Sequence, residues 1–569
     1  MSSNFVIYNK KKNIKEISQK FGITPLTSVI LCNRDIENDI AISKILSDSL
    51  DDLNDEKLLP NVDVACHILN NAIVSRKNIR IVGDYDVDGV CATFILYDNI
   101  KKLGANVSYY IPDRFKDGYG INVDIINDAI KDKIDLIVTC DNGIAANEQI
   151  TYAKNHGIDV LVTDHHDVQV LPCDAVAIVD PKIDDEKNLY PFNGICGATV
   201  AMKFMMRYFD LYNENLGRKY ILDNYLEFAT IATVSDIMPL IDENHIIVKR
   251  GLNKILETKN KGLKKLLEIS EIDFENRGIT TYHIGFIIGP LINAAGRMEE
   301  ATMALTLFLS CDDDEINQIA YKLKELNNER KSMTDMGSKN ALSIAENEYS
   351  NDKVLVIYVE GLGEQVAGIV AGRVKDKCNK PVIILTDTVE EDVAKASCRS
   401  IEAYNIFEAL NGQKDMLLKF GGHKLAAGFS ILKKDIKNLR EKLNEEAKLQ
   451  ESDFVKKTYI DAEFPFYEMS EDIVADIEKL EPYGQNFQRP TFATRDVDVK
   501  ILNVYGNNKN IVKISLEKDN KVLTGILFEE SYLLEERLKN GGTLDIVYYP
   551  KINEYKGNKS VEINLIAYR

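Results

Sequence analysis

The chain has 569 residues, well beyond the roughly 250–300 residues at which one hydrophobic core stops growing, so a single small module is excluded and two to four domains are expected. A composition of 45% hydrophobic and 28% charged residues with 13 prolines excludes a disordered or fibrous chain. The net charge of −19 argues against coating nucleic acid through bulk positive charge, although a local basic groove stays possible.

The nine cysteines have no CxxC spacing and stand mostly in apolar stretches, which predicts buried free thiols in a reducing compartment. The first residues lack the apolar stretch of a signal peptide, and no apolar run approaches the ~18 residues of a membrane span. We therefore expect a cytoplasmic protein without a membrane partner.

Residues 60 to 200 alternate short β-branched runs with helical periodicity, which is typical of a doubly wound parallel α/β sheet. Four apolar runs each end in Asp: residues 78–84, 135–141, 159–164 and 175–180. Because ligands bind beyond the carboxyl ends of parallel strands, these acids are predicted to meet at one edge of the sheet.

Residues 201 to 310 are predicted to be mostly helical. Ile316, Ile319, Leu323, Leu326 and Met333 then recur at helical spacing and predict one long amphipathic helix that bridges two lobes.

A second α/β unit is predicted from strands at 353–359 and 381–385 around a helix at 367–377, and a charged helical segment at 433–457 follows it. Six strand-like runs between 458 and 568, with turns at Gly506-Asn507-Asn508 and Lys556-Gly557-Asn558, predict a C-terminal β-barrel.

Three carboxylates alternate in the segment GDYDVDG. In an extended segment, Asp84, Asp86 and Asp88 would lie on one side with nothing basic beside them, which calls for a cation. A solvated Asp-rich turn is the alternative. A calcium loop of the EF-hand type fits the first half, but its twelfth position is Ile95 instead of a bidentate Glu.

Two further polar groups end neighbouring strands, Asp141-Asn142-Gly143 and Asp164-His165-His166. A lone His is more often structural, but two adjacent ones that follow an Asp and share an edge with four carboxylates favour ligands. Oxygen ligands with one or two imidazoles suit Mn²⁺ or Mg²⁺ better than a zinc site, and the number of ligands fits two ions. Two such ions favour in-line displacement at phosphorus, which predicts hydrolysis of a phosphoester.

The motifs GDYDVDG, DNG, DHH and SDIMPL, in this order, resemble the DHH phosphoesterase superfamily and, within it, the RecJ family of single-stranded-DNA exonucleases. The likeness extends over residues 60 to 569. It includes Pro112-Asp113-Arg114-Phe115 with Gly118-Tyr119-Gly120, Asn293-Ala294-Ala295-Gly296-Arg297, and Gly421-Gly422-His423 with Ala426-Ala427-Gly428.

The resemblance implies a set of metal ligands and a set of substrate contacts. The implied ligands are Asp84, Asp86, Asp88, Asp141, His165 and Asp236. His166 would face the scissile phosphate, and we expect it to be catalytic together with Asp141 and Asp88. The expected substrate contacts are Arg114, Asn293, Arg297, Arg373, Arg399, Gly421, Gly422 and His423.

Some of these contacts have an interpretation that does not depend on the family. The element around Gly421 and Gly422 can be interpreted as a backbone nest that binds an anion, or as a plain turn. The arginines are candidate phosphate forks, although a surface salt bridge is the commoner role of any single Arg.

The chain departs from the family pattern at two places. Residues 361–365 read Gly-Leu-Gly-Glu-Gln where many members carry a Trp-His pair, and Gln485-Asn486-Phe487 replaces a common Gly-Asn-Pro. Neither departure touches a predicted metal ligand.

The resulting prediction is a metal-dependent exonuclease that degrades single-stranded DNA from the 5′ end in DNA repair and recombination. The expected domains are a DHH catalytic domain with an N-terminal extension (1–310), a linker helix (311–350), a DHHA1 domain (351–450) and an OB-like barrel (455–569). Expected partners are single-stranded DNA, single-strand-binding protein and a helicase.

Two alternatives stay open. One is a phosphodiesterase for short oligoribonucleotides or cyclic dinucleotides, against which the barrel argues, because tiny substrates need no extended strand-holding surface. The other is a non-catalytic DNA-binding scaffold, against which the intact ligand set argues.

Overall fold

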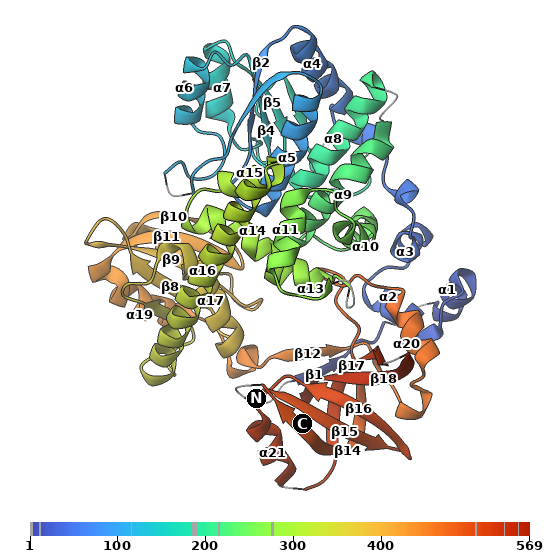
Figure 1. Cartoon of the computed structure of the whole chain (residues 1–569). Coiled ribbons are helices and arrows are strands. Elements are labelled where there is room, and N and C mark those ends of the chain that lie inside the picture. The colour runs from blue at the N-terminus through green and yellow to red at the C-terminus, as the bar shows by residue number, and fades with distance from the viewer. Residues whose placement is uncertain are drawn as a thin grey trace. The chain divides into compact units, whose positions relative to one another are not determined.

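The computed structural model describes residues 4–569 except 11–12, 115, 184–189, 214–216, 275–277, 507–508, 540 and 556. The chain forms two compact units (Figure 1). One consists mainly of residues 324–458 with 297–299, and the other of residues 5–296, 300–323 and 459–569.

A parallel five-stranded sheet organises the N-terminal part, in the order β3-β2-β4-β5-β6. Its strands are β2 (Asn78–Val82), β3 (Asn106–Tyr110), β4 (Leu136–Cys140), β5 (Asp159–Thr163) and β6 (Ala177–Val179). The four predicted strands are confirmed. β3 was not predicted, because it is an edge strand with only one buried residue and lacks a continuous apolar run.

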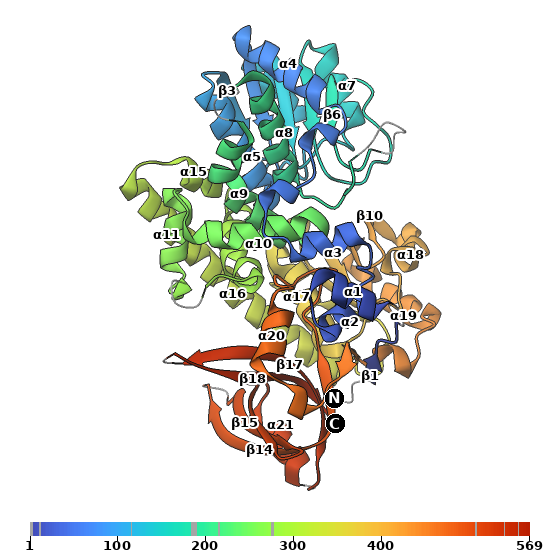
Figure 2. The same cartoon turned by 90° about the vertical axis from the view of Figure 1, so that its right-hand side faces the viewer.

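Helices cover both faces of this sheet (Figures 1 and 2). On one face α4 (Val62–Val74), α5 (Val87–Lys102) and α8 (Gly197–Tyr212) pack on a core that includes Ile81 and Val138. On the other face, α6 (Val123–Lys131) and α7 (Asn147–Asn155) pack on Ile137 and Val160. Alternate residues of the strands thus serve opposite faces, as the doubly wound class requires.

The stretch that follows is largely helical, as predicted. Its elements are α9 (Gly217–Ser235), α10 (Asp242–Leu256), α11 (Lys261–Ile269), α13 (Thr281–His283), the π-helical turn η3 (Ile284–Ile288), α14 (Gly289–Met298) and α15 (Thr302–Leu309). Among the described residues, no helix is long and apolar enough to cross a membrane.

The long helix α16 (Asp313–Asn347) confirms the predicted amphipathic helix. Ile316 and Leu323 in its first part belong to the core of the parallel-sheet unit. Ala341 and Ala345 in its last part pack with Leu355 and Val366 of the other unit. The helix therefore contributes to both units.

The second unit contains a five-stranded sheet in the order β10-β11-β9-β8-β7. Its elements are β7 (Leu355–Tyr358), α17 (Glu364–Cys378), β8 (Val382–Asp387), β9 (Val393–Arg399), α18 (Ile406–Asn411), β10 (Leu417–His423), β11 (Ala426–Leu432) and α19 (Ile436–Glu446). The charged segment 433–457 is α-helical only over α19, where Leu439 and Leu443 supply a buried face.

Five C-terminal strands close into a barrel in the order β14-β15-β16-β18-β17, because β17 also pairs with β14. They are β14 (Phe492–Tyr505), β15 (Ile511–Lys518), β16 (Lys521–Leu527), β17 (Leu544–Tyr555) and β18 (Asn558–Tyr568), with β13 (Ala462–Glu463), α20 (Glu471–Glu478) and α21 (Ser531–Lys539) beside them. The predicted barrel is confirmed. Of the predicted turns, Asn507, Asn508 and Lys556 lie outside the described residues, while Gly506 and Gly557 have positive φ.

The N-terminal segment joins the barrel and not the parallel sheet. Strand β1 (Asn4–Ile7) pairs with β12 (Lys457–Ile460), and helices α1 (Ile14–Phe21), α2 (Pro25–Asn33) and α3 (Asp39–Leu46) follow β1. Ile30 and Ile42 share a hydrophobic core with Phe466 and Tyr548. A nearly buried ion pair of 2.7 Å joins Arg34 to Asp461.

The cysteines are free, as predicted, but not all of them are buried. Cys173 and Cys311 are exposed and Cys378 is half-buried. The first two lie in the loops that follow β5 and α15, where the neighbouring apolar residues do not form part of a continuous strand or helix.

Candidate metal centre

The carboxyl ends of the parallel strands carry the predicted acids. Asp141, Asp164 and Asp180 directly follow β4, β5 and β6, and Asp84 stands two residues beyond β2. Because the strands are parallel and adjacent, these side chains come to the same edge of the sheet.

The segment from Asp84 to Asp88 is not extended, contrary to the expectation from its alternating acids. Asp86 is the N-cap of α5, and its carboxylate accepts a hydrogen bond of 3.1 Å from the backbone N–H of Gly89. Asp88 therefore lies in the first helical turn. The turn is tight, since a Cβ on Gly89 would come within 2.5 Å of the Asp84 carbonyl oxygen. Helix capping overrides the strand-like alternation.

The N-terminus of α8 binds the Asp88 carboxylate through backbone hydrogen bonds. The backbone N–H groups of Gly197 and Ala198 donate to its two carboxylate oxygens at 2.6 and 2.7 Å. Sequence reasoning missed this contact, because nothing in the local sequence indicates that a helix more than 100 residues away begins here.

His165 lies at the centre of the cluster. Its Nε2 is 3.0 Å from Asp141, 3.5 Å from Asp88 and 3.8 Å from Asp236. Three overlapping groups have potential ligand atoms within 4.8 Å of one another: Asp84/Asp86/Asp141, Asp88/His165/Asp236 and Asp141/His165/His166. Together they contain all six side chains that the sequence predicts as metal ligands.

The cluster disfavours its own negative charge. Burial, reinforced by the neighbouring carboxylates, raises the pKa of Asp84 and of Asp236 to about 8. Burial and the adjacent acids likewise raise the pKa of Asp86 and Asp141, and burial alone raises that of Asp88. Burial also lowers the pKa of His165 to about 4, so this imidazole stays neutral and can act as a ligand.

A divalent cation fits these residues. Oδ1 of Asp84 is buried without a hydrogen-bond partner, and the surrounding carboxylates repel one another. Oxygen atoms with one neutral imidazole form the ligand set that Mn²⁺ and Mg²⁺ accept.

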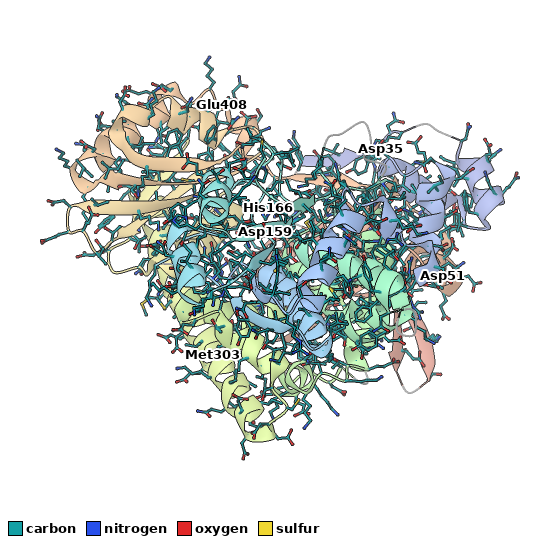
Figure 3. The ribbon with its side chains drawn as sticks, turned by 90° about the horizontal axis from the view of Figure 1, so that it is seen from above. Asp35, Asp51, Asp159, His166, Met303 and Glu408 are labelled. Carbon is teal, nitrogen blue, oxygen red and sulfur yellow. The ribbon has the colours of Figure 1, made fainter. Side chains whose placement is uncertain are left out.

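His166, which is labelled in Figure 3, follows His165 in the chain and is held by its neighbours. Its Nδ1 is 2.8 Å from Asp164, and the hydroxyl of Tyr119 is 3.2 Å from its ring nitrogens and donates to the carbonyl oxygen of Asp141 at 3.0 Å. Burial opposes protonation of His166, but the hydrogen bond and charge of Asp164, together with the charges of Asp236 and Asp88, outweigh it and raise the pKa to about 9. His166 is therefore a cationic donor whose side chain is 44% exposed.

In the second unit, three predicted contacts share one face of the sheet. Arg399 pairs in register with Ala426, which pairs with His423, and Gly421 pairs with Gly428 two residues further along, on the same face. Gly421 and Gly422 thus belong to the edge strand β10 and do not form the predicted nest, because β11 holds them extended. Burial lowers the pKa of Arg399, whose guanidinium donates to the Cys398 carbonyl oxygen at 2.8 Å.

The other predicted contacts have varied surroundings. Arg373 forms an exposed ion pair with Asp335, the commoner role of a surface Arg. Arg297 donates to the Gln365 carbonyl oxygen at 3.3 Å, and the Arg114 guanidinium lies 5.1 Å from the centre of the Tyr85 ring. Asn293 is half-buried in α14, and Phe115 lies outside the described residues.

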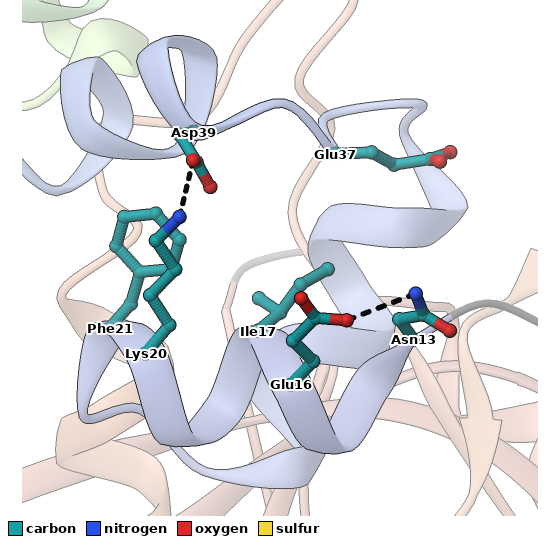
Figure 4. Close-up of a pocket in the computed structure, with 7 residues that line it drawn as sticks. All are labelled: Asn13, Glu16, Ile17, Lys20, Phe21, Glu37 and Asp39. Atoms are coloured by element: carbon teal, nitrogen blue, oxygen red, sulfur yellow. Dashed lines mark hydrogen bonds and ion pairs between the residues drawn. The ribbon is translucent and has the colours of Figure 1, made fainter.

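Two hollows lie away from the cluster. An open groove on the barrel, of about 550 Å³, is lined by Lys513, Lys521 and Lys559 and by Glu471 and Glu562 among others. A second cavity, of about 430 Å³ and drawn in Figure 4, lies on the N-terminal helices and is lined by Glu16, Glu37 and Asp39 among others. Neither contains a residue of the cluster.

The fold and this edge of acids and histidines define a phosphoesterase of the DHH class. Models of known families match residues 78–233 (DHH family, N-terminal domain), 351–449 (DHHA1 domain) and 460–567 (RecJ OB domain).

Relatives over nearly the whole chain narrow the class to one family. The single-stranded-DNA-specific exonuclease RecJ of Bacillus subtilis is 32% identical over 97% of this chain and 68% of its own length. The RecJ protein of Escherichia coli is 31% identical over 89% of each chain. This chain belongs to the RecJ family.

Solved structures agree with this assignment. Thermus thermophilus RecJ in complex with Mn²⁺ has the same fold, with a TM-score of 0.80 and 23% identity over all of this chain and 79% of that one. A structure of exonuclease RecJ bound to manganese, 30% identical, has a TM-score of 0.59 over 69% of this chain and 96% of its own.

Proposed function

We propose that this chain is a metal-dependent exonuclease that removes nucleotides from the 5′ end of single-stranded DNA, in DNA repair and recombination. The observation that carries the proposal is the buried cluster of five carboxylates and His165, with the protonated His166 beside it. The polarity rests on the family resemblance alone.

Asp84, Asp86, Asp88, Asp141, His165 and Asp236 would hold two ions, Mn²⁺ or Mg²⁺. When bound, such ions lower the pKa of a water molecule and neutralise charge at the phosphate that it attacks. Asp141 and His165 each belong to two of the three ligand groups. The hydrogen bonds from α8 fix the orientation of Asp88, so its carboxylate is preorganised.

His166 would donate a hydrogen bond to the scissile phosphate. Asp164 fixes its ring and supports its positive charge, and Tyr119 contacts the ring from the solvent side. A cationic donor that is already in place stabilises the charge that develops on the phosphate oxygens in the transition state.

The sheet face with Arg399, His423 and Gly421 would bind a neighbouring phosphate. Arg399 is half-buried and has no acidic partner among the described residues, so an anion would compensate its charge. No side chain fills the space over Gly421, and a phosphate can approach the backbone there. Arg114, Asn293 and Arg297 stay proposed contacts, and Arg373 would first have to leave Asp335.

The C-terminal barrel would hold the strand through its lysine groove, which fits a polyanion better than a dinucleotide. This favours a long substrate over short oligoribonucleotides. The complete set of six ligand residues disfavours the alternative of a non-catalytic DNA-binding scaffold. Single-strand-binding protein and a helicase as partners, a cytoplasmic location and the domain boundaries predicted above also belong to the proposal.

The test compares end-labelled single-stranded DNA, duplex DNA, RNA and dinucleotides as substrates, with Mn²⁺ and with EDTA. We expect mononucleotides from the 5′-labelled single strand with Mn²⁺ and no product with EDTA. Faster hydrolysis of dinucleotides than of a long strand would favour the short-substrate phosphodiesterase.

A further inference from the structure

Two exposed aromatic rings stack on each other close to the metal centre. Tyr282 of α13 and Phe286 of the π-helical turn η3 have ring centroids 4.9 Å apart and planes inclined by 25°. They are 61% and 66% exposed. Such an open apolar pair gains nothing from burial in the folded chain, and π-helical turns often mark functional sites.

The backbone that carries Phe286 packs on the end of α9, directly before the metal-centre residue Asp236. A Cβ built on Gly285 would lie 4.0 Å from Val234, and one built on Gly289 would lie 2.6 Å from the Ser235 hydroxyl. These two contacts flank Phe286 on both sides. The aromatic pair is therefore anchored beside the candidate metal ligand Asp236, at the end of α9, through the two residues that precede it.

Ile237, the residue after Asp236, adds a third exposed apolar group. It has a φ of 56° and closes α9: its N–H donates to Val234, and that of Met238 donates to Thr233. Glycine usually takes this helix-ending position, and a β-branched residue there is strained. The side chain is 68% exposed, so packing does not compensate the strain. Strain of this kind marks sites where a side chain is needed for contact with a ligand.

The same surface adjoins the segment that leads into the barrel. The hydroxyl of Thr281 donates to the Tyr483 carbonyl oxygen at 2.8 Å. The backbone N–H of Leu240 donates to the Gln485 carbonyl oxygen, also at 2.8 Å. The aromatic pair and Ile237 thus lie between the metal centre, which they adjoin through the end of α9, and the segment that leads into the barrel, which Thr281 and Leu240 contact.

We propose that Ile237, Tyr282 and Phe286 form a stacking platform for unpaired bases of the bound single-stranded DNA, between the metal centre and the barrel. The proposal rests on the proposed function. Flat aromatic faces bind every base through stacking, and bases that are paired in a duplex cannot offer their faces. The platform would therefore contribute to the preference for single strands without reading sequence.

The chain has no tryptophan, so Phe286→Trp introduces a single tryptophan fluorophore. With EDTA to prevent hydrolysis, we expect oligothymidylate to quench this fluorescence, with the same saturation curve as fluorescence anisotropy of the labelled oligonucleotide. Tyr321→Trp, at an exposed position on α16, is the matched control and should not be quenched. Binding by anisotropy without quenching in Phe286→Trp would overturn the platform, whereas absence of any binding and of hydrolysis would overturn the proposed function itself.

Kinetics supply a second measurement. Phe286→Ala should raise KM for a long single strand about 10-fold, within the range for loss of one base–aromatic stack, and leave hydrolysis of thymidine 5′-p-nitrophenyl phosphate unchanged. Phe286→Tyr should restore the KM. An equal loss on both substrates would show damage to the metal centre instead and overturn the platform.

Discussion

The carboxylates of the metal centre are buried, which disfavours their ionised form, yet they must be ionised to bind a cation. A buried carboxylate without a cation favours its protonated form, and five of them within one cluster disfavour ionisation together. The site is thus built for a ligand with high positive charge. Burial keeps His165 neutral, whereas the hydrogen bond and charge of Asp164 keep His166 protonated.

Asp141→Asn should abolish hydrolysis, because it removes a ligand shared by two groups. We expect a loss greater than the roughly 100-fold that removal of an outer-shell partner costs. Without metal, the variant should unfold at a higher temperature than the wild type, since one member of the like-charged cluster is gone. Hydrolysis and thermal unfolding, each measured with Mn²⁺ and with EDTA, test both parts; full activity at saturating Mn²⁺ would refute the two-ion site.

Asp180 provides a pH-dependent test outside the proposed ligands. Burial and the nearby Asp164 raise its pKa to about 7, against 3.8 as the ordinary value. Between these values the folded chain retains a proton that the unfolded chain has released, so stability falls as pH rises. Asn does not titrate, so Asp180→Asn keeps its stability as the pH rises. Its free energy of unfolding should exceed that of the wild type by about 2 kcal/mol at pH 8, and the difference should vanish near pH 4. Urea unfolding at both pH values measures it; a difference independent of pH would contradict the assignment.

At the scale of elements, helix ends shape the centre. α5 begins at the Asp cluster, the first backbone N–H groups of α8 donate to Asp88, and Asp236 directly follows α9. Each helix start or end places backbone groups where side chains of distant segments need them.

Gly197→Ala tests the fit between α8 and the cluster. A Cβ here would lie 2.7 Å from the Asp141 Cβ and 3.0 Å from its carboxylate, so Asp141 must move. We expect kcat to fall at least about 100-fold, by the same reasoning as for displaced metal partners. Gly372→Ala in α17 is the matched control: nothing lies within 4 Å, and alanine should stabilise that helix by about 0.5–1 kcal/mol. Equal activity of the two variants would show that the packing of α8 on Asp141 does not position the metal ligands.

Two neighbouring glycines of β10 test the substrate face of the second unit. A Cβ on Gly422 would lie 2.5 Å from the Ala426 carbonyl oxygen, so Gly422→Ala should distort the hairpin and lower the melting temperature. Gly421→Ala has free space and should fold normally. If a phosphate approaches the backbone at Gly421, this variant should still raise KM for single-stranded DNA about 10-fold, as loss of one charge-assisted hydrogen bond does. An unchanged KM would place the phosphate elsewhere.

At the scale of the whole molecule, the N-terminus and the barrel depend on each other. Ile30 and Ile42 share their core with Phe466 and Tyr548, so removing residues 455–569 would expose the N-terminal helices. Truncation therefore cannot isolate DNA binding by the barrel, and surface substitutions are the proper test.

Replacing Lys513, Lys521 and Lys559 by Gln should weaken binding of long single strands. Three lost phosphate contacts should lower the slope of log affinity against log salt by about 2. Replacement of Lys101, Lys133 and Lys264, exposed lysines outside the barrel, is the control. Fluorescence anisotropy over a range of salt concentrations gives both slopes; equal slopes would assign the groove to another partner.

The sequence by itself determined the local periodicities, and these predicted the parallel sheet, the long helix and the barrel, whereas the set of six metal ligands is what the resemblance of its motifs to a known family implies. Acids that end parallel strands meet wherever the sheet forms, because strand direction fixes their edge. Only the tertiary structure decided the rest. The backbone of Gly197 and Ala198 reaches Asp88, β11 holds Gly421 and Gly422 in a strand, and the N-terminal helices pack on the barrel. Such contacts join residues far apart in the chain through backbone groups and shared apolar area, and neither leaves a periodic signal in a single sequence.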